Sequence, residues 1–132
     1  MISAVRIGAL ALLVVLGVAP AHADDIGLTP ALDTCLDKAG GVTTDMVNCI
    51  GAEIEIQDKR LNAAYQKALA ALTPARKKEL QTVQRLWLQF RDANCSFAFD
   101  PDGGTMAHVE SSGCVMTMTA QRAEELEALA AR

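Results

Sequence analysis

Five polar side chains interrupt helical stripes that are otherwise apolar, and these residues are the ones best placed to do chemistry. They are Asp58, Asn62, Gln84, Arg91 and Arg122. Asp58 and Asn62 are four residues apart, so a helix would carry both on one face. If the chain turns back near residue 73, Arg91 comes within a turn of Asp58, and because a buried charge persists only when paired, we predict an ion pair between them. The two amides would complete the hydrogen-bond network, with Arg122 as a candidate further member.

This predicted network has a catalytic and a structural interpretation. Asp58, Arg91 and Tyr65 in a pocket could polarise a substrate, but no nucleophile with an adjacent base is among them. No catalytic triad, paired carboxylates or Gly-rich phosphate loop can be assembled elsewhere. Paired polar residues between helices more often fix their register. We therefore interpret the network as structural, with ligand or partner contact as the next alternative, and expect neither catalytic residues nor a cofactor.

The first 23 residues have the pattern of a cleavable signal peptide. Arg6 precedes an apolar run at 7–18, and the segment ends in Ala21-His22-Ala23, the small-x-small pattern that signal peptidases cut. The apolar run has 12 residues, whereas a membrane-spanning helix needs roughly 20. We predict a single domain at 24–132 that is periplasmic or secreted, without a membrane span. Asp24 follows the cleavage site where lipid attachment would require a cysteine, so no lipid anchor is expected.

The exported chain is acidic, which limits the partners it could bind. Removing the first 23 residues leaves 11 basic and 16 acidic side chains. Such a charge argues against nucleic acid or an anionic membrane as a partner and favours a cationic one. A chain of this length can bury one modest core. The pattern leaves the oligomeric state open.

Four cysteines in the exported chain predict two disulfide bonds, because their number is even and export brings them to an oxidising compartment. None forms a Cys-x-x-Cys pair, and His108 alone could not complete a usual zinc site. We therefore expect no metal. Of the three possible pairings we favour neighbours in sequence, since each would close a short loop worth about 3 kcal/mol in the chain-entropy model. The favoured bridges are Cys35–Cys49 and Cys95–Cys114, while a Cys49–Cys95 bridge remains an alternative.

Three helices are expected to position these residues, so the fold class is all-α. Apolar residues recur at helical spacing within 44–72, 75–97 and 115–131. Thr73-Pro74 would end the first helix and begin the second, since proline fits the first helical position. The short connection predicts a long antiparallel hairpin, with the third helix following a cysteine-closed loop. The second helix is expected to carry on its inner face Leu80, Val83, Trp87 and Phe90.

The segment 96–113 is expected to be that loop. It contains Asp100-Pro101-Asp102-Gly103-Gly104, which is typical of turns. An Asp-x-Asp-Gly run can also indicate a calcium loop, but the position that would hold the bidentate glutamate is Ser111, so we expect no calcium. The acidic side chains of this loop are Asp100, Asp102 and Glu110.

Two longer segments resemble the N-terminal domain family of the lysozyme inhibitor LprI, which are small exported bacterial proteins. The segments are Asp-x-x-Leu-Asn-x-x-Tyr at 58–65 and Gln-x-x-Trp-Leu-x-Phe-Arg-Asp-x-x-Cys at 84–95. With the four cysteines and the export signal, the resemblance covers nearly the whole exported chain. It implies a disulfide-linked helical domain of the bacterial envelope whose activity is inhibition of lysozyme.

The charge of the chain agrees with what the resemblance implies. Common animal lysozymes are strongly basic, so an acidic domain would be steered toward them. We therefore expect a non-enzymatic binding protein that protects peptidoglycan, with the acidic loop residues Asp100, Asp102 and Glu110 as its inhibitory element. The alternative is an envelope stress or assembly module, such as a small chaperone or an accessory partner of a cell-wall or secretion complex. Such a module would act through an exposed apolar helix face.

Overall fold

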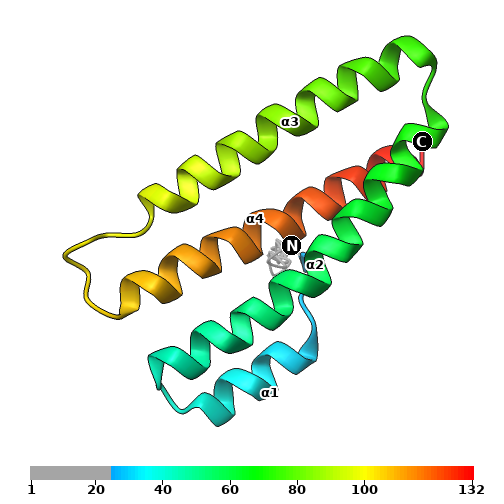
Figure 1. The fold of residues 1–132 in the computed structure, drawn as a ribbon. Helices are drawn as coiled ribbons and strands as arrows, with labels where there is room; N and C mark the ends of the chain where they lie inside the picture. Colours follow the sequence, from blue (N-terminus) through cyan, green and yellow to red (C-terminus); the bar gives the residue numbers. More distant parts are fainter. Residues whose placement is uncertain (1–24) are drawn as a thin grey trace, which may run out of the picture.

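The computed structural model describes residues 25–132, and these form helices joined by short loops, with no strand among them (Figure 1). The helices are α1 (Pro30–Ala39), α2 (Thr43–Ala71), α3 (Pro74–Phe97) and α4 (Met106–Ala130). The prediction of an all-α fold is confirmed. The predicted signal peptide lies outside the described residues. None of the helices in the described part is long and apolar enough to cross a membrane.

Helix α1 was not predicted, and its ends follow local chemistry. Pro30 occupies the first helical turn, where the missing N–H costs nothing. Gly40 ends the helix in the left-handed conformation with φ of 55°, which glycine adopts without strain. The helix is short and buries only Leu32 and Ala39. Its apolar stripe was too brief to stand out by periodicity.

Helix α4 begins at Met106, so the expected loop at 96–113 is wrong over most of its length. The loop between α3 and α4 is restricted to residues 98–105. Serine and glycine at 111–113 had indicated a turn, yet their helical conformation satisfies both serine hydroxyls. Ser112 donates to the His108 carbonyl at 2.7 Å, and Ser111 donates across to the Cys95 carbonyl at 2.8 Å. Serine favours turns because its hydroxyl competes with the helix for backbone N–H and C=O groups. Here both hydroxyls donate to carbonyls while the backbone stays helical.

The helices pack around α2 and α4. These two run in the same direction and share the most extensive contact, while α3 runs antiparallel to both and packs mainly on α4 (Figure 1). The α2–α3 hairpin is therefore antiparallel as predicted, but it is splayed, because α4 lies between its arms. Helix α1 folds back against the start of α2.

Two apolar clusters divide the molecule into a hairpin end and a bridged end. The hairpin end comprises residues 56–91 and 119–132, and its core is made of Leu61, Ala64, Ala68, Leu80, Ala123 and Leu126. The bridged end comprises residues 30–55 and 92–118, and its smaller core is made of Leu32, Ala39, Cys49, Ile50 and Met116. Both disulfide bonds lie in the bridged end.

The disulfide pairing is the one that the sequence favoured. Cys35 of α1 is bonded to Cys49 of α2, with Cα atoms 5.7 Å apart. Cys95 of α3 is bonded to Cys114 of α4, with Cα atoms 5.4 Å apart. Each bridge therefore ties a peripheral helix to one of the two central helices.

The predicted inner face of α3 is only half correct. Leu80 and Trp87 do face α2 and α4, but Val83 and Phe90 are 49% and 60% exposed. Helix α3 carries two apolar stripes, and α4 covers one of them. Periodicity identifies both stripes but cannot say which of them has a partner.

Candidate partner-binding surface

The predicted polar network forms in part where α2, α3 and α4 meet. Arg91 Nη1 lies 3.7 Å from Asp58 Oδ1 and donates to Thr119 Oγ1 at 3.2 Å. On the same seam Arg122 Nε donates to Gln84 Oε1 at 3.0 Å. Asn62 is exposed, and no side-chain hydrogen bond joins it to this network in the described part of the chain. The structure thus brings four of the five residues together, as two pairs.

Trp87 connects the two pairs. The guanidinium carbons of Arg91 and Arg122 lie 5.4 and 5.8 Å from its ring centroid, within the range of cation–π attraction. Both arginine side chains are largely buried, at 14% and 13% exposure. Their charges are balanced first by a carboxylate on the same helix, Asp92 at 2.9 Å from Arg91 and Glu125 at 2.7 Å from Arg122. The indole ring and the neighbours on other helices add to this. The seam fastens α3 onto α4, and it leaves no nucleophile beside a base for catalysis.

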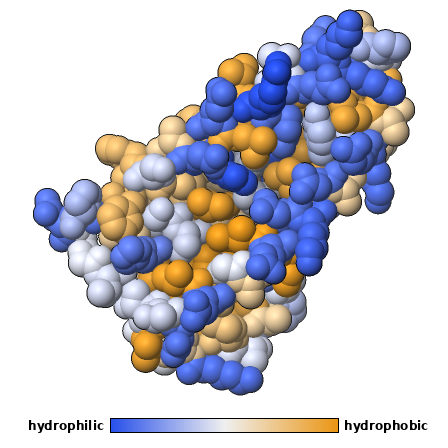
Figure 2. Space-filling model, viewed as in Figure 1, coloured by the Kyte–Doolittle hydropathy of each residue, from blue (hydrophilic) through white to orange (hydrophobic). Residues whose placement is uncertain are grey.

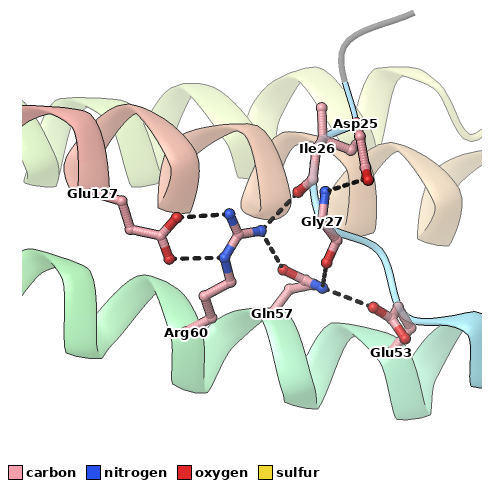
Figure 3. A network of polar contacts seen from close by, with 7 residues as sticks. All are labelled: Asp25, Ile26, Gly27, Glu53, Gln57, Arg60 and Glu127. Atoms are coloured by element: carbon pink, nitrogen blue, oxygen red, sulfur yellow. Dashed lines mark hydrogen bonds and ion pairs between the residues drawn. The ribbon is translucent and has the colours of Figure 1, made fainter.

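A second polar network was missed by sequence reasoning, and it anchors residues 25–29 across α2 (Figure 3). Gln57 donates to the Gly27 carbonyl at 2.9 Å and to Glu53 Oε1 at 2.7 Å. Arg60 donates to the Ile26 carbonyl at 2.6 Å. Residues 25–29 have no periodicity that could have predicted this contact. The available signal was the presence of Glu53 and Gln57, four residues apart, on the stripe of α2 that also carries Ile50 and Leu61.

Glu53 remains ionised although it is only 2% exposed. Burial alone would raise the pKa of its carboxyl group. Hydrogen bonds from the Thr29 hydroxyl, from Gln57 and from the Thr29 backbone N–H together lower the pKa by more than burial raises it, so the net pKa is below the ordinary value. The same network continues to α4, where Arg60 donates to both carboxylate oxygens of Glu127 at 2.8 and 2.7 Å. This pairing lowers the pKa of Glu127. This second network, which we call the strap network, therefore fixes residues 25–29 to α2 and α4.

Formal charge is unevenly distributed between the two ends of the molecule. The bridged end carries nine acidic side chains and one basic side chain, Lys38. The hairpin end carries ten basic and five acidic side chains. In the orientation of Figure 1, hydrophilic side chains crowd the hairpin end, and more apolar surface is exposed toward the middle and the bridged end (Figure 2). The acidity of the chain is thus a property of one end.

The outermost part of the bridged end, which we call the tip, consists of residues 42–48 and 97–108. The starts of α2 and α4 meet there, with the hydroxyl oxygens of Thr43 and Thr105 3.2 Å apart. A hollow of about 330 Å³ lies beside this contact. Phe99 packs edge-on against His108, with ring centroids 4.9 Å apart. Large apolar side chains are nonetheless exposed around the tip, namely Val42, Phe97, Phe99 and Met106.

The three acidic residues predicted to share one loop are placed in two elements. Asp100 and Asp102 are exposed in the loop at 98–105, where the Asp100 carboxylate accepts the Asp102 N–H at 2.9 Å. Glu110 is exposed on the second turn of α4 instead. Within the described residues no cluster of three potential metal ligands occurs. The tip therefore presents carboxylates, exposed apolar side chains and a hollow on one surface.

Comparison with known proteins identifies the family. The family model of the lysozyme inhibitor LprI matches residues 35–126, which include both disulfide bonds and both polar pairs of the seam. An uncharacterized protein of Rhizobium meliloti (strain 1021) is 33% identical over 106 residues, covering 74% of this chain and 70% of the relative. No solved structure is significantly similar to the chain. The chain belongs to the LprI lysozyme inhibitor family.

Proposed function

We propose that the protein is an exported, non-enzymatic inhibitor of lysozyme that binds the enzyme through its tip. Family membership supports the class of activity. The observation that carries the placement is the segregation of charge, because nine of the acidic side chains lie in the bridged end. A strongly basic lysozyme would be attracted to this end and repelled by the hairpin end. The periplasm, or the medium outside the cell, is the compartment in which such an inhibitor protects peptidoglycan.

The tip combines the two elements of a protein–protein interface. Asp100 and Asp102 supply charges that steer encounter and exclude wrong partners. Phe99 and Met106, exposed at 36% and 45%, supply apolar area for the centre of the contact, where aromatic and methionine side chains are enriched.

The tip is also held in place before a partner arrives. The Cys95–Cys114 bridge closes the segment behind the loop, and the Thr43–Thr105 contact joins the two helix starts. A loop with fewer conformations loses less entropy on binding. The bridges therefore contribute to affinity as well as to stability.

The test is a titration into a lysozyme assay on bacterial cell walls, with protein purified from the periplasm after expression of the full-length chain. The variant Asp100→Asn, Asp102→Asn, Glu110→Gln neutralises two carboxylates of the tip and one on the adjoining turn of α4, and we call it the tip variant. It should weaken inhibition about tenfold or more, because rim and steering charges are lost. Its matched control has the same change in net charge at the hairpin end. The control substitutions are Glu79→Gln, Glu124→Gln and Glu125→Gln.

The position of the lost charges decides the outcome. The control should inhibit within about twofold of the natural protein, since distant exposed charges are screened beyond a Debye length of roughly 10 Å at 0.1 M salt. If both variants weakened inhibition equally, only the net charge of the protein would matter, and the position of the charges at the tip would not. If the tip variant inhibited lysozyme as well as the natural protein does, these carboxylates would not be part of the interface.

Salt dependence separates this proposal from the alternative of an envelope chaperone or assembly module. Inhibition through the acidic tip should weaken steadily as ionic strength rises. Binding of unfolded clients through apolar surface should be unchanged or strengthened. Absence of inhibition with binding that resists salt would favour the alternative.

A further inference from the structure

Helix α3 carries an apolar stripe that nothing in the described part of the chain covers. Val83, Leu86, Phe90 and Phe97 are exposed at 49%, 60%, 60% and 90%. Their spacings of three, four and seven residues place them on one side of the helix. In a heptad pattern the first and fourth residues of every seven are apolar. Val83, Phe90 and Phe97 occupy first positions here, and Leu86 and the exposed Ala93 occupy fourth positions.

The stripe is long enough to pack against another helix. From Val83 to Phe97 it extends about 21 Å along the axis at 1.5 Å per residue. Isolated exposed apolar residues need no explanation, but a contiguous row of this kind marks an interaction surface. Leu86 and Phe90 lie on the side of α3 away from Gln84, which is buried against the rest of the molecule. Val83 lies at the edge of the stripe, where it lines a hollow with Leu80 and with Leu126 of α4.

Charges along α3 indicate what the stripe binds. The first turns carry Arg76, Lys77 and Lys78, whereas Asp92 lies near the end of the helix and the loop that follows carries Asp100 and Asp102. This order opposes the helix dipole, since cations are favoured at the C-terminus and anions at the N-terminus. Within one chain Arg76 is paired with Glu79 and Asp92 with Arg91. No ion pair joins Lys77, Lys78 or the two loop carboxylates to another side chain in the described part of the chain. A second α3 lying antiparallel would place the basic start of each helix beside the acidic end of the other.

We propose that the protein forms a homodimer in which α3 packs antiparallel against α3 of a second copy through this stripe. A two-fold interface brings the same surface of both protomers together. In the register that pairs first with fourth heptad positions, Leu86 lies level with Phe90 of the second copy, and Val83 lies level with its small Ala93. Arg76 then comes level with the loop that carries Asp100. The same register places Phe97 level with Glu79 of the second copy. The apolar match is therefore made by residues 83–93, and the charge match by Arg76 and the loop that carries Asp100.

The dimer does not depend on the proposed lysozyme binding. The hollow of the tip is formed by the starts of α2 and α4, but Phe97 and the loop that carries Asp100 and Asp102 belong to both proposed contacts. Phe90 lies outside the tip, so a substitution there affects the stripe alone. A variant that disrupts the dimer can therefore still inhibit lysozyme, and a protein without inhibitory activity can still dimerise.

Sedimentation equilibrium tests the dimer on protein purified from the periplasm after expression of the full-length chain, from micromolar to millimolar concentration at low salt. Phe90→Lys should weaken association roughly 30-fold or more, because it places a charge at the centre of the apolar contact. Phe90 is exposed, so the variant should keep its fold, which circular dichroism checks. The matched control is Ile56→Lys, at a 42% exposed apolar position on α2, and it should dimerise like the natural protein.

A charge swap tests the antiparallel orientation. Reversal of the basic start (Arg76→Glu, Lys78→Glu) and reversal of the acidic end (Asp100→Lys, Asp102→Lys) should each weaken the dimer. The chain with all four substitutions should recover it, because opposite charges again face each other. Failure to recover would overturn the antiparallel pairing.

Two other results would overturn the proposal. One is a dimer that Phe90→Lys leaves unchanged, since the stripe would then lie outside the interface. The other is a monomer at every concentration. In that case the stripe would serve a different protein or, where mass spectrometry shows them retained, residues 1–24.

Discussion

The hairpin end and the bridged end of the molecule are held together in different ways. The hairpin end has no disulfide bond and relies on a cluster of leucine and alanine side chains, in which Leu126 is 1% exposed. The bridged end has a core of five buried side chains and both disulfide bonds. Like charges accumulate at the bridged end, and Phe97 remains 90% exposed there. Covalent links allow this end to tolerate like charges and exposed apolar side chains that its packing alone would not stabilise.

The largest expected effect tests the apolar core of the hairpin end. Leu126→Ala should lower the free energy of unfolding by about 2–5 kcal/mol, because it leaves a cavity between α2, α3 and α4. Leu86→Ala is the matched control, measured at a protein concentration too low for association through α3. The same change at this 60% exposed position should then cost less than about 1 kcal/mol. Urea unfolding followed by circular dichroism measures both. If the two variants lost similar amounts of unfolding free energy, Leu86 would be buried, and α3 would pack through another face than the one described.

Removing the bridge between α3 and α4 tests the covalent part of the comparison. The double variant Cys95→Ser, Cys114→Ser should lose about 3 kcal/mol of stability through the larger entropy of its unfolded chain. Amide hydrogen exchange should accelerate first at residues 92–118, with the hairpin end following only in global unfolding. Uniform acceleration over both ends would mean that the bridged end does not form a separate unit.

Acid should weaken the attachment of residues 25–29 through Glu53. Because its folded-state pKa lies below the ordinary value of 4.5, its contribution is fully present above that pH and is lost as pH falls through the folded pKa. Glu53→Gln should cost about 2 kcal/mol at neutral pH, since hydrogen bonds to a charged group are lost. The difference between the two proteins should shrink on acidification. Thermal unfolding across this range measures it, and a constant difference would contradict the assignment.

The smallest expected effect concerns the ion pair that the sequence predicted. Asp58 is 49% exposed and 3.7 Å from Arg91, so Asp58→Ala should cost less than about 1 kcal/mol. Its lysozyme inhibition per folded molecule should equal that of the natural protein. Loss of inhibition without a change in melting temperature would show that Asp58 contacts the enzyme.

Residues with local signals were predicted well. Proline at position 74 marked the turn between α2 and α3, and sequence separation alone favoured the correct disulfide pairing. The seam was predicted because Asp58 and Arg91 break apolar stripes whose spacing is regular. Each of these inferences depends on contacts close in sequence or on a simple hairpin register.

Features that depend on distant packing were missed. The strap network joins Gln57 to Gly27 and Arg60 to Glu127, and no periodic pattern links such positions. The start of α4 was misplaced because Ser111 is stable in a helix only when its hydroxyl finds an acceptor. That acceptor is the Cys95 carbonyl in α3, which the sequence around Ser111 does not indicate. The exposure of Phe90 could not be foreseen, since it depends on which side of α3 meets α4.

Hydrogen-exchange footprinting of the protein bound to a basic animal lysozyme tests the central claim most directly. We expect added protection at the starts of α2 and α4 and in the loop at 98–105, with the α2–α3 turn at residues 72–74 unchanged. Protection confined to the hairpin end, or no complex at low salt, would contradict the claim that the bridged, acidic end is the inhibitory surface.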